Sequence, residues 1–254
     1  MKIILYSVLG IMIPFIGTCI GSMFVFFCKK ELSDRFHKCM IGIAVGVMLA
    51  ASVWSLIIPS IDMSSNIYVI KCLPTIVGLV LGIIFLICVD IVSRKIENNV
   101  KKEKINMLWF SVTLHNIPEG MAVGVCFAGL LSGNAEINLI NALILALGIG
   151  IQNVPEGAII SMPMHTKGKP KFKSFISGVI SGIVEPIAAI FTIALLNLVV
   201  PLLPYLLSFA AGAMIYVVIE ELVPEMQVGK KSYCVILSVI FGFIIMLFLD
   251  VMLG

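Results

Sequence analysis

Eight long apolar runs follow one another along the chain, and short polar stretches separate them. The runs cover approximately residues 3–28, 37–60, 71–93, 107–131, 137–163, 173–199, 202–224 and 232–253. Each is long enough for an α-helix to cross a bilayer, which takes about 20 residues. Because 60% of the residues are hydrophobic and 12% are charged, the sequence predicts an all-α integral membrane protein with eight transmembrane helices. Residues 1–254 are expected to form a single membrane domain.

Positively charged residues mark every second connection between these runs. Fifteen of the 17 Lys and Arg residues fall in the stretches 29–38, 94–104, 167–173 and 230–231, and only Lys2 and Lys71 lie elsewhere. Cytoplasmic loops carry the excess of Lys and Arg in membrane proteins. The pattern therefore predicts that these four loops are cytoplasmic and that both termini lie outside. The regular alternation also supports the count of eight helices.

Three weak matches recur in the same order in the first three and the last three runs. They are Gly-x3-Pro at 10–14 and 182–186, Gly-x-Met at 46–48 and 212–214, and Gly-x7-Asp at 82–90 and 242–250. The offset of five helices is odd, so matching helices cross the membrane in opposite directions. We expect an inverted repeat of helices 1–3 and 6–8 flanking helices 4 and 5, a plan common among secondary transporters.

The two central runs contain the most costly polar residues of the chain. The fourth run carries His-Asn-Ile-Pro-Glu-Gly at 115–120, and the fifth carries Gln-Asn-Val-Pro-Glu-Gly at 152–157. A charged side chain at the centre of a transmembrane helix costs about 2.5–3.5 kcal/mol on the insertion scale. Polar residues with so high a free energy of insertion are usually functional. The repetition of the motif indicates one polar site built from two helices.

Helical spacing places the polar residues of each motif on one face, because positions three and four apart are neighbours on a helix. The two patches consist of His115, Asn116 and Glu119, and of Gln152, Asn153 and Glu156. Both lie roughly 10–12 Å from the cytoplasmic end at 1.5 Å per residue, so they can meet at one level. The prolines of the motifs are expected to break the helices and free a backbone carbonyl, which is tolerated where the backbone lines a cavity.

The sixth and second runs add Glu185 and Met48 at a similar depth. No buried Lys or Arg is available to pair with the three glutamates, so they must be protonated, hydrated or bound to a cation. Met48 alone would be read as packing, but a structural role does not explain the whole set. Oxygen and nitrogen donors with few thiolates suit Zn²⁺, Fe²⁺, Mn²⁺ or Cd²⁺ better than Cu⁺.

The His-Asn-x-Pro-Glu-Gly motif of the fourth run resembles the ZIP (Zrt/Irt-like) family of divalent-metal transporters, for which it is highly specific. The resemblance spans all eight helices. Gly-Val-Met-Leu-Ala-Ala-Ser-x-Trp at 46–54 and Glu-Glu-Leu-Val-Pro-Glu at 220–225 are similar to the bacterial GufA-like members. The resemblance implies a transporter rather than an enzyme.

The resemblance also implies a two-metal site between helices 2, 4, 5 and 6. One metal position would use Met48, His115, Glu119, Gln152 and Glu156. The adjoining position would use Asn116, Glu119, Asn153, Glu156 and Glu185, with Glu119 and Glu156 bridging. Many family members have His at the position of Gln152, and some have Asp at that of Asn153. The neutral side chains present here leave open which metal is preferred and whether both positions fill.

Five further carboxylates lie near the ends of the predicted helices. Glu220, Glu221 and Glu225 fall near the cytoplasmic end of helix 7, Asp90 near the cytoplasmic end of helix 3, and Asp250 near the outer end of helix 8. We hypothesise that they form exit and entrance stations for the metal. Simple anchoring at the membrane interface is the alternative.

The predicted function is uptake of a divalent cation into the cytoplasm, with Zn²⁺ as the first candidate and Fe²⁺, Mn²⁺ and Cd²⁺ as others. No organic cofactor and no nucleic acid partner are expected. One alternative is an intramembrane metalloenzyme, which would keep an open zinc position, but the chain has no His-Glu-x-x-His. The other is a proton or monovalent-cation carrier, against which the pairing of His115 with Met48 argues.

The expected partners are divalent metal ions and the lipid bilayer, and the resemblance also allows a homodimer. The chain has 15 Lys against 2 Arg, a bias typical of AT-rich genomes. This bias indicates a bacterial source and therefore a multi-pass protein of the plasma membrane.

Overall fold

The computed structural model describes residues 2–27, 33–64, 71–99, 104–133, 137–166, 168–227 and 232–253. Within these residues the regular structure is helical throughout, and eight segments are long and apolar enough to span a membrane. The spans are Ile4–Phe27, Asp34–Asp62, Leu73–Val92, Val112–Leu131, Leu139–Thr166, Lys171–Ala194, Asn197–Met226 and Tyr233–Met252. The prediction of an all-α protein with eight transmembrane helices is confirmed.

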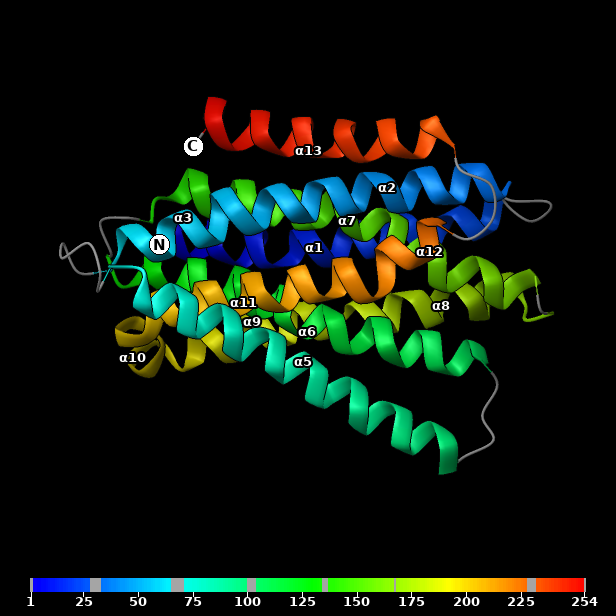
Figure 1. Cartoon of the computed structure of the whole chain (residues 1–254), viewed down its shortest axis with the longest axis horizontal. Coiled ribbons are helices and arrows are strands. Elements are labelled where there is room, and N and C mark those ends of the chain that lie inside the picture. The colour runs from blue at the N-terminus through cyan, green and yellow to red at the C-terminus, as the bar shows by residue number, and fades with distance from the viewer. Residues whose placement is uncertain are drawn as a thin grey trace.

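Five of these spans consist of one helix each, and three are assembled from shorter pieces (Figure 1). The single helices are α1 (Lys2–Phe27), α5 (Leu73–Asn99), α6 (Lys104–Leu131), α7 (Leu139–Thr166) and α13 (Tyr233–Leu253). The second span combines α2 (Asp34–Ala51), η1 (Ser52–Ile57) and α3 (Ile58–Asp62). The sixth combines α8 (Lys171–Gly182) and α9 (Val184–Ala194). The seventh comprises α10 (Leu196–Val199), η2 (Val200–Leu202), α11 (Leu203–Val217), η3 (Val218–Leu222) and α12 (Val223–Gln227).

Prolines account for the interruptions, because proline cannot donate the backbone hydrogen bond that continues an α-helix. Two π-helical segments, η1 and η3, end just before Pro59 and Pro224. The turn between α8 and α9 lies just before Pro186. The prolines of the two motifs behave differently, since α6 continues through Pro118 and α7 through Pro155. The expected helix breaks at these two prolines were therefore wrong, although each proline still removes one donor from the ladder.

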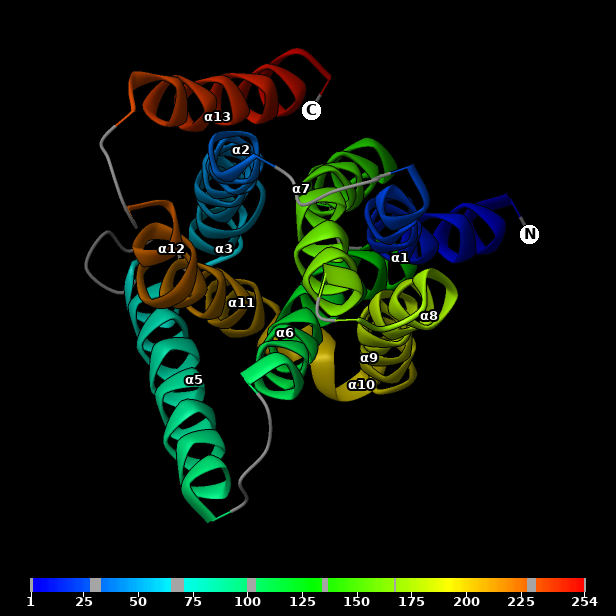
Figure 2. The ribbon, with the colours of Figure 1, turned by 90° about the vertical axis from the view of Figure 1, so that its right-hand side faces the viewer.

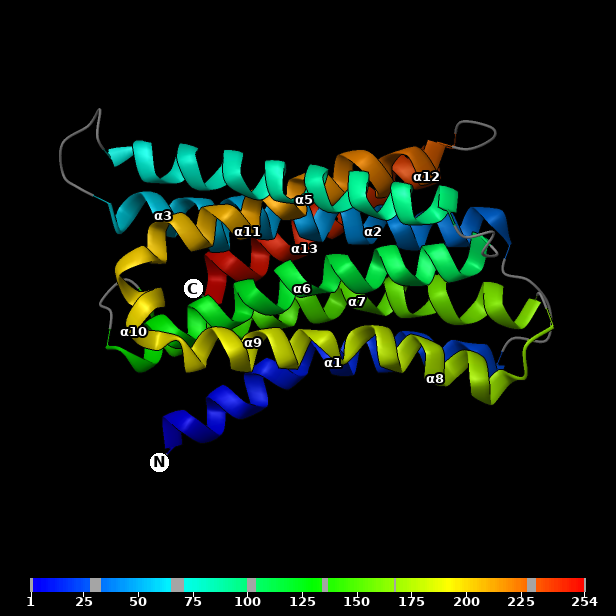
Figure 3. The same cartoon turned by 90° about the horizontal axis from the view of Figure 1, so that it is seen from below.

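Seen end-on, the helices form two groups (Figure 2), and the eight spans divide equally between them. One group contains α1, α6, α7 and the span of α8 and α9. The other contains the span of α2 and α3, then α5, the span of α11 and α12, and α13. Helix α1 begins at the same end of the bundle at which α13 finishes (Figures 1 and 3), as an even number of crossings requires. Which end faces the cytoplasm remains a prediction from the Lys and Arg distribution.

The pairing of the helices follows the expected inverted repeat. Helix α2 packs against α13 and α5 against α11, while α1 packs against α7 and α6 against α9. The inverted repeat relates the first span to the sixth, the second to the seventh, the third to the eighth and the fourth to the fifth. Under this relation the pair of α2 and α13 corresponds to the pair of α11 and α5, and the pair of α1 and α7 corresponds to the pair of α9 and α6. The packing thus supports an inverted repeat of helices 1–3 and 6–8 around helices 4 and 5.

Helices α5 and α13 lie on the outside of the bundle and are mostly exposed. In the most apolar 18-residue stretch of each helix, only 22% is buried inside the protein. Their exposed side chains are large and apolar, for example Ile84 and Phe85 on α5 and Phe241 and Phe248 on α13. A helix satisfies its own backbone polar groups, so such a surface can face lipid tails directly. The protein is therefore a multi-pass membrane protein.

The glycines that close the two motifs allow neighbouring helices to approach very closely. A Cβ atom at Gly120 would lie 2.3 Å from the carbonyl oxygen of Glu185, and one at Gly157 would lie 2.2 Å from the carbonyl oxygen of Thr18. These distances are too short for any side chain, so small residues are required at both crossings. The glycine of α6 thereby admits α9, and the glycine of α7 admits α1.

Replacing Gly120 by alanine should therefore destabilise the protein, because a backbone carbonyl cannot move aside as a side-chain end can. We expect Gly120→Ala to cost about 1–3 kcal/mol, the usual range for overpacking. The midpoint of thermal aggregation of the detergent-solubilised protein would measure the effect.

Gly129→Ala is the matched control on the same helix. A Cβ there would meet the terminal Cδ1 of Ile137 at 2.5 Å, and this atom can move away. Equal midpoints for the two variants would show that the close crossing of α6 and α9 is not required.

Candidate metal site

The polar residues of the two motifs lie side by side in the interior of the protein, on the antiparallel helices α6 and α7. Glu185 of α9, which is hydrogen-bonded to them, and Met48 of α2 are buried as well. The exposed fractions are 0% for Met48, Asn116, Gln152, Asn153 and Glu185, 2% for Glu119 and 6% for Glu156. The side chain of His115 lies outside the described residues, although its backbone belongs to α6, one turn before Glu119. All seven predicted residues of the central site whose side chains are described are therefore buried.

Amide groups connect the carboxylates of this site. The side chain of Gln152 donates from Nε2 to Oε1 of Glu119 at 2.6 Å, which joins α7 to α6. Asn153 donates from Nδ2 to Oε2 of Glu185 at 2.8 Å, which joins α7 to α9. Asn116 donates from Nδ2 to Oε1 of Glu185 at 3.2 Å and also to the carbonyl oxygen of Ser181 at 3.0 Å. Three helices are thus linked through hydrogen bonds between side-chain amides and carboxyl groups.

Thr18 on α1 adds a fourth helix to the network. Its hydroxyl donates to Oε1 of Glu185 at 2.9 Å, and its side chain is 1% exposed. Thr18 was not predicted from the sequence, because a single hydroxyl in an apolar helix matches no motif. The available signal was that α1 carries Thr18 and Ser22 one turn apart within a long, mostly apolar run.

Four oxygen atoms of the site are buried and accept no hydrogen bond from any residue that the structure describes. They are Oδ1 of Asn116, Oε2 of Glu119, Oε1 of Gln152 and Oδ1 of Asn153. A buried acceptor without a partner costs about 1–3 kcal/mol, so four at one place need an explanation. All four are acceptors, and a cation is the partner that satisfies several acceptors at once. Oxygen donors of this kind suit divalent cations.

The described side chains supply a mixed donor set. Among them, no three from His, Cys, Asp and Glu converge closely enough to hold a metal ion by themselves. The amides of Gln152 and Asn153 lie between the carboxylates, and the imidazole of His115 lies outside the described part. The site therefore consists of carboxylates interleaved with amides.

The structure connects two of the predicted exit carboxylates to this site. A small cavity of about 20 Å³ is lined by Glu156 of the site together with Glu221 and Glu225, and by Val112, Ile159, Val217 and Leu222. Glu220 is exposed on η3, and Asp90 is partly exposed on α5. Neither Glu220 nor Asp90 lines the cavity next to Glu156.

Asp250, the predicted entrance carboxylate, lies at the opposite end of the bundle from Glu225. It accepts a hydrogen bond from Oγ of Ser55 at 2.7 Å. Both line a cavity of about 100 Å³ together with Trp54, Pro59, Cys126, Ile137, Asn141 and Leu207. The cavity is lined by Pro59 near the end of the second span and by Asn141 near the start of the fifth, which is the predicted outer end.

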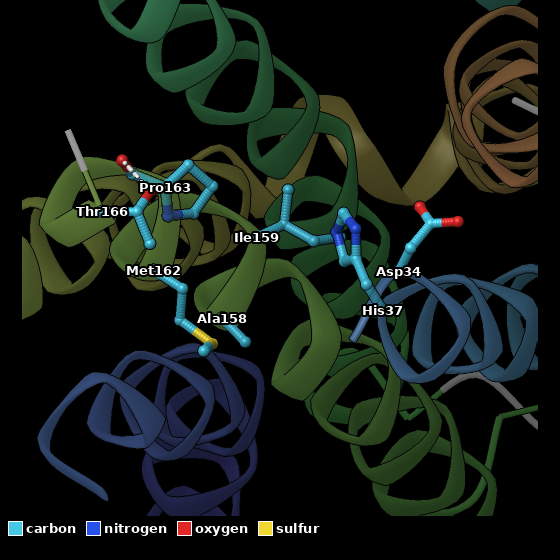
Figure 4. Close-up of a pocket in the computed structure, with 7 residues that line it drawn as sticks. All are labelled: Asp34, His37, Ala158, Ile159, Met162, Pro163 and Thr166. Carbon is cyan, nitrogen blue, oxygen red and sulfur yellow. Dashed lines mark hydrogen bonds between the residues drawn. The ribbon is translucent and has the colours of Figure 1, made fainter. Parts of the chain in front are cut away.

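His37, which was not predicted as a site residue, lies beside Glu225. Nε2 of His37 on α2 is 3.8 Å from Oε1 of Glu225. His37 also lines a cavity of about 320 Å³ with Asp34, Ala158, Ile159, Met162, Pro163 and Thr166 (Figure 4). The chain contains only three histidines. Because histidine is so rare in this sequence, each one was a candidate for a functional role, and this was the signal for His37.

Comparison with known sequences places this site in a family. The family model described as "ZIP Zinc transporter" matches residues 104–250, which contain both motifs and Glu185. The chain belongs to the ZIP family. Of its ZIP relatives, Zinc transporter ZIP11 of Xenopus tropicalis is 33% identical over 99% of this chain and 98% of its own length. Zinc transporter ZIPB of Bordetella bronchiseptica is 32% identical over 98% of this chain and 82% of its own length. Zinc transporter GufA of Myxococcus xanthus is 36% identical over 57% of this chain and 54% of its own length.

Removal of the Thr18 hydroxyl should weaken the hold on Glu185 in this ZIP protein. We expect Thr18→Val, which keeps the shape of the side chain, to cost about 1 kcal/mol of stability. We also expect it to raise the KM for metal uptake by about three-fold or more, because partners that orient a ligand affect metal affinity. Thermal aggregation and uptake by reconstituted protein would measure the two effects.

Thr192→Val provides a control in the same group of helices. The Thr192 hydroxyl donates to the carbonyl oxygen of Ala188 within α9 at 2.8 Å, so its loss leaves Glu185 untouched. If Thr18→Val and Thr192→Val had the same KM, the hydrogen bond from α1 would have no role at the site.

Proposed function

We propose that this protein carries divalent zinc across the plasma membrane of a bacterium into the cytoplasm. The observation that carries the proposal is the group of four buried acceptor oxygens without donors, contributed by Asn116, Glu119, Gln152 and Asn153. Relatives that match almost the whole of this chain are named zinc transporters, and this supports zinc as the substrate. Fe²⁺, Mn²⁺ and Cd²⁺ are further candidates, because the same donors accept them.

The proposed metal site has two adjoining positions. One uses Met48, His115, Glu119, Gln152 and Glu156, and the other uses Asn116, Glu119, Asn153, Glu156 and Glu185. The hydrogen bonds divide in the same way, since Gln152 contacts Glu119 whereas Asn116 and Asn153 both contact Glu185. In each position, entry of a cation would replace amide donors by direct bonds to the carboxylates and to the free amide oxygens.

The proposed direction of transport runs from the cavity at Asp250 through the central site to Glu221 and Glu225. In the predicted orientation both termini are outside, so this direction is inward. An inside-negative potential contributes about 2.3 kcal/mol per charge per 100 mV, or roughly 4.6 kcal/mol for a divalent ion. Movement of one group of four spans against the other would open the site to the two sides in turn, and the division visible in Figure 2 supports such a motion.

The two alternative functions are not favoured. The named relatives are transporters and not enzymes, and the donor set contains neutral amides where a proton carrier would need only carboxylates.

A homodimer would cover part of the exposed apolar surface of the outer helices, and light scattering of the purified protein would measure its presence.

Uptake of radioactive zinc by proteoliposomes tests the proposed function. Native protein should accumulate zinc under an inside-negative potential, and Glu119→Gln should reduce the initial rate by at least about ten-fold, because it removes a charge shared by both metal positions. Thr192→Val, a buried polar residue outside the site, should retain the native rate. Equal uptake by native protein and Glu119→Gln would refute the site, and no uptake by native protein would refute the function.

Substitutions at Gln152 test whether this neutral side chain is a ligand. Gln152→His replaces an amide by a better zinc donor and should tighten zinc binding by about ten-fold or more, while Gln152→Leu should weaken it by a similar factor. Calorimetric titration of the detergent-solubilised protein measures both. Unchanged affinity in both variants would remove Gln152 from the coordination sphere.

A further inference from the structure

Two cavities lie on the path between the central site and the bundle end that is predicted to be cytoplasmic. The larger, of about 320 Å³, is here called the vestibule and is lined by Asp34, His37, Ala158, Ile159, Met162, Pro163 and Thr166. The smaller one is the cavity of about 20 Å³ next to Glu156, Glu221 and Glu225. Ile159 lines both. The partition between the cavities therefore includes Ile159 and the contact of His37 with Glu225.

His37 is placed at this partition by the first turn of α2. The chain enters the helix at Ser33, whose Oγ accepts the backbone N–H of Phe36, and His37 follows within that turn. Figure 4 shows its ring directed toward Ile159 of α7. The neighbouring charges of the same turn, Asp34 and Lys38, form an ion pair with each other, and Asp34 lines the same cavity as His37. Glu225 of α12 is the carboxylate that approaches Nε2 of the imidazole from another helix.

The geometry of His37 and Glu225 does not fit a hydrogen-bonded ion pair. Nε2 of His37 is buried and makes no hydrogen bond within the described part of the chain, whereas a protonated imidazole held by Glu225 would donate one from this atom. The separation of 3.8 Å from Nε2 to Oε1 of Glu225 exceeds the usual limit of about 3.2 Å for a hydrogen bond. It lies close to the roughly 3.4 Å between a nitrogen and an oxygen ligand of one tetrahedral zinc ion, given bonds of about 2.0–2.2 Å.

We propose that His37 and Glu225 form a station for a divalent cation between the central site and the vestibule. The inference rests on the proposed function. An ion that leaves Glu156 meets Glu221 and Glu225 in the small cavity, then binds between Glu225 and the imidazole of His37, and is released into the vestibule. The station has two protein ligands and completes its shell with water, so it binds weakly. Weak binding suits a transit site, from which the ion must also depart.

Uptake kinetics provide the first test. We expect His37→Gln to lower the maximal rate of zinc uptake by about five-fold or more while changing KM little, because loss of the station slows release after the central site has bound. His165→Gln is the matched control. His165 lies at the same end of the protein, where its Nδ1 contacts the carbonyl oxygen of Lys169 at 3.0 Å, and it should leave uptake unchanged.

A double variant tests whether the two residues act together. If they share one ion, Glu225→Gln should lower the rate as His37→Gln does, and the double variant should be no slower than the slower single variant, since contacting residues are not additive. Native rates for His37→Gln, or fully additive losses in the double variant, would overturn the proposal.

The second test does not depend on any variant. Crystals of the native protein soaked in Cd²⁺ should show anomalous density between Nε2 of His37 and the carboxylate of Glu225, in addition to density at the central site. Central density without this second peak at saturating Cd²⁺ would overturn the station and leave the proposed function intact. Absence of zinc uptake by the native protein would instead overturn the proposed function.

Discussion

The carboxylate of Glu185 is the point at which the interior of this protein is tied together. It accepts hydrogen bonds from Thr18 of α1, Asn116 of α6 and Asn153 of α7, so four spans of one group meet at a single side chain. A buried charge without such partners would cost several kcal/mol. Here the donors that stabilise the carboxylate also hold the amide oxygens of Asn116 and Asn153 in place, where they accept no hydrogen bond. Structural support and the proposed metal binding thus use the same residues.

The inverted repeat explains why the two motifs differ in chemistry although their packing is equivalent. Gly120 admits α9 to α6, and Gly157 admits α1 to α7, at almost the same distances. The two crossings then deliver different side chains, a glutamate from α9 and a threonine from α1. The backbone plan is symmetric, and the donor set built on it is not. A site with two unlike halves can offer a metal ion two unequal positions.

Hydropathy and charge were sufficient to predict the number of spans, because eight apolar runs and four basic loops have few alternative readings. The buried motif residues were predicted from helical spacing, which places Asn116 beside Glu119 and Asn153 beside Glu156. Thr18 and His37 were not predicted, because each owes its role to a partner more than 160 residues away and neither belongs to a local pattern. The behaviour of the prolines was only partly predictable. Pro118 and Pro155 lie in helices packed on several sides, and this packing keeps the helix continuous where the isolated sequence favours a break.

The two π-helical segments, η1 and η3, occupy equivalent places in the second and seventh spans and precede Pro59 and Pro224. Each widened turn accommodates one more residue than an α-helical turn, so it shifts the angular register of everything beyond it. Ser55 lies in η1 and contacts Asp250, while Glu221 lies in η3 and lines the cavity beside Glu156. The loss of one residue from either segment would rotate the following turn by about 100° and direct its polar groups toward lipid. The number of residues in η1 and η3 is consequently as constrained as the identity of the residues at the central site. Insertions or deletions in η1 or η3 should be far rarer among functional variants than insertions or deletions in the connecting loops.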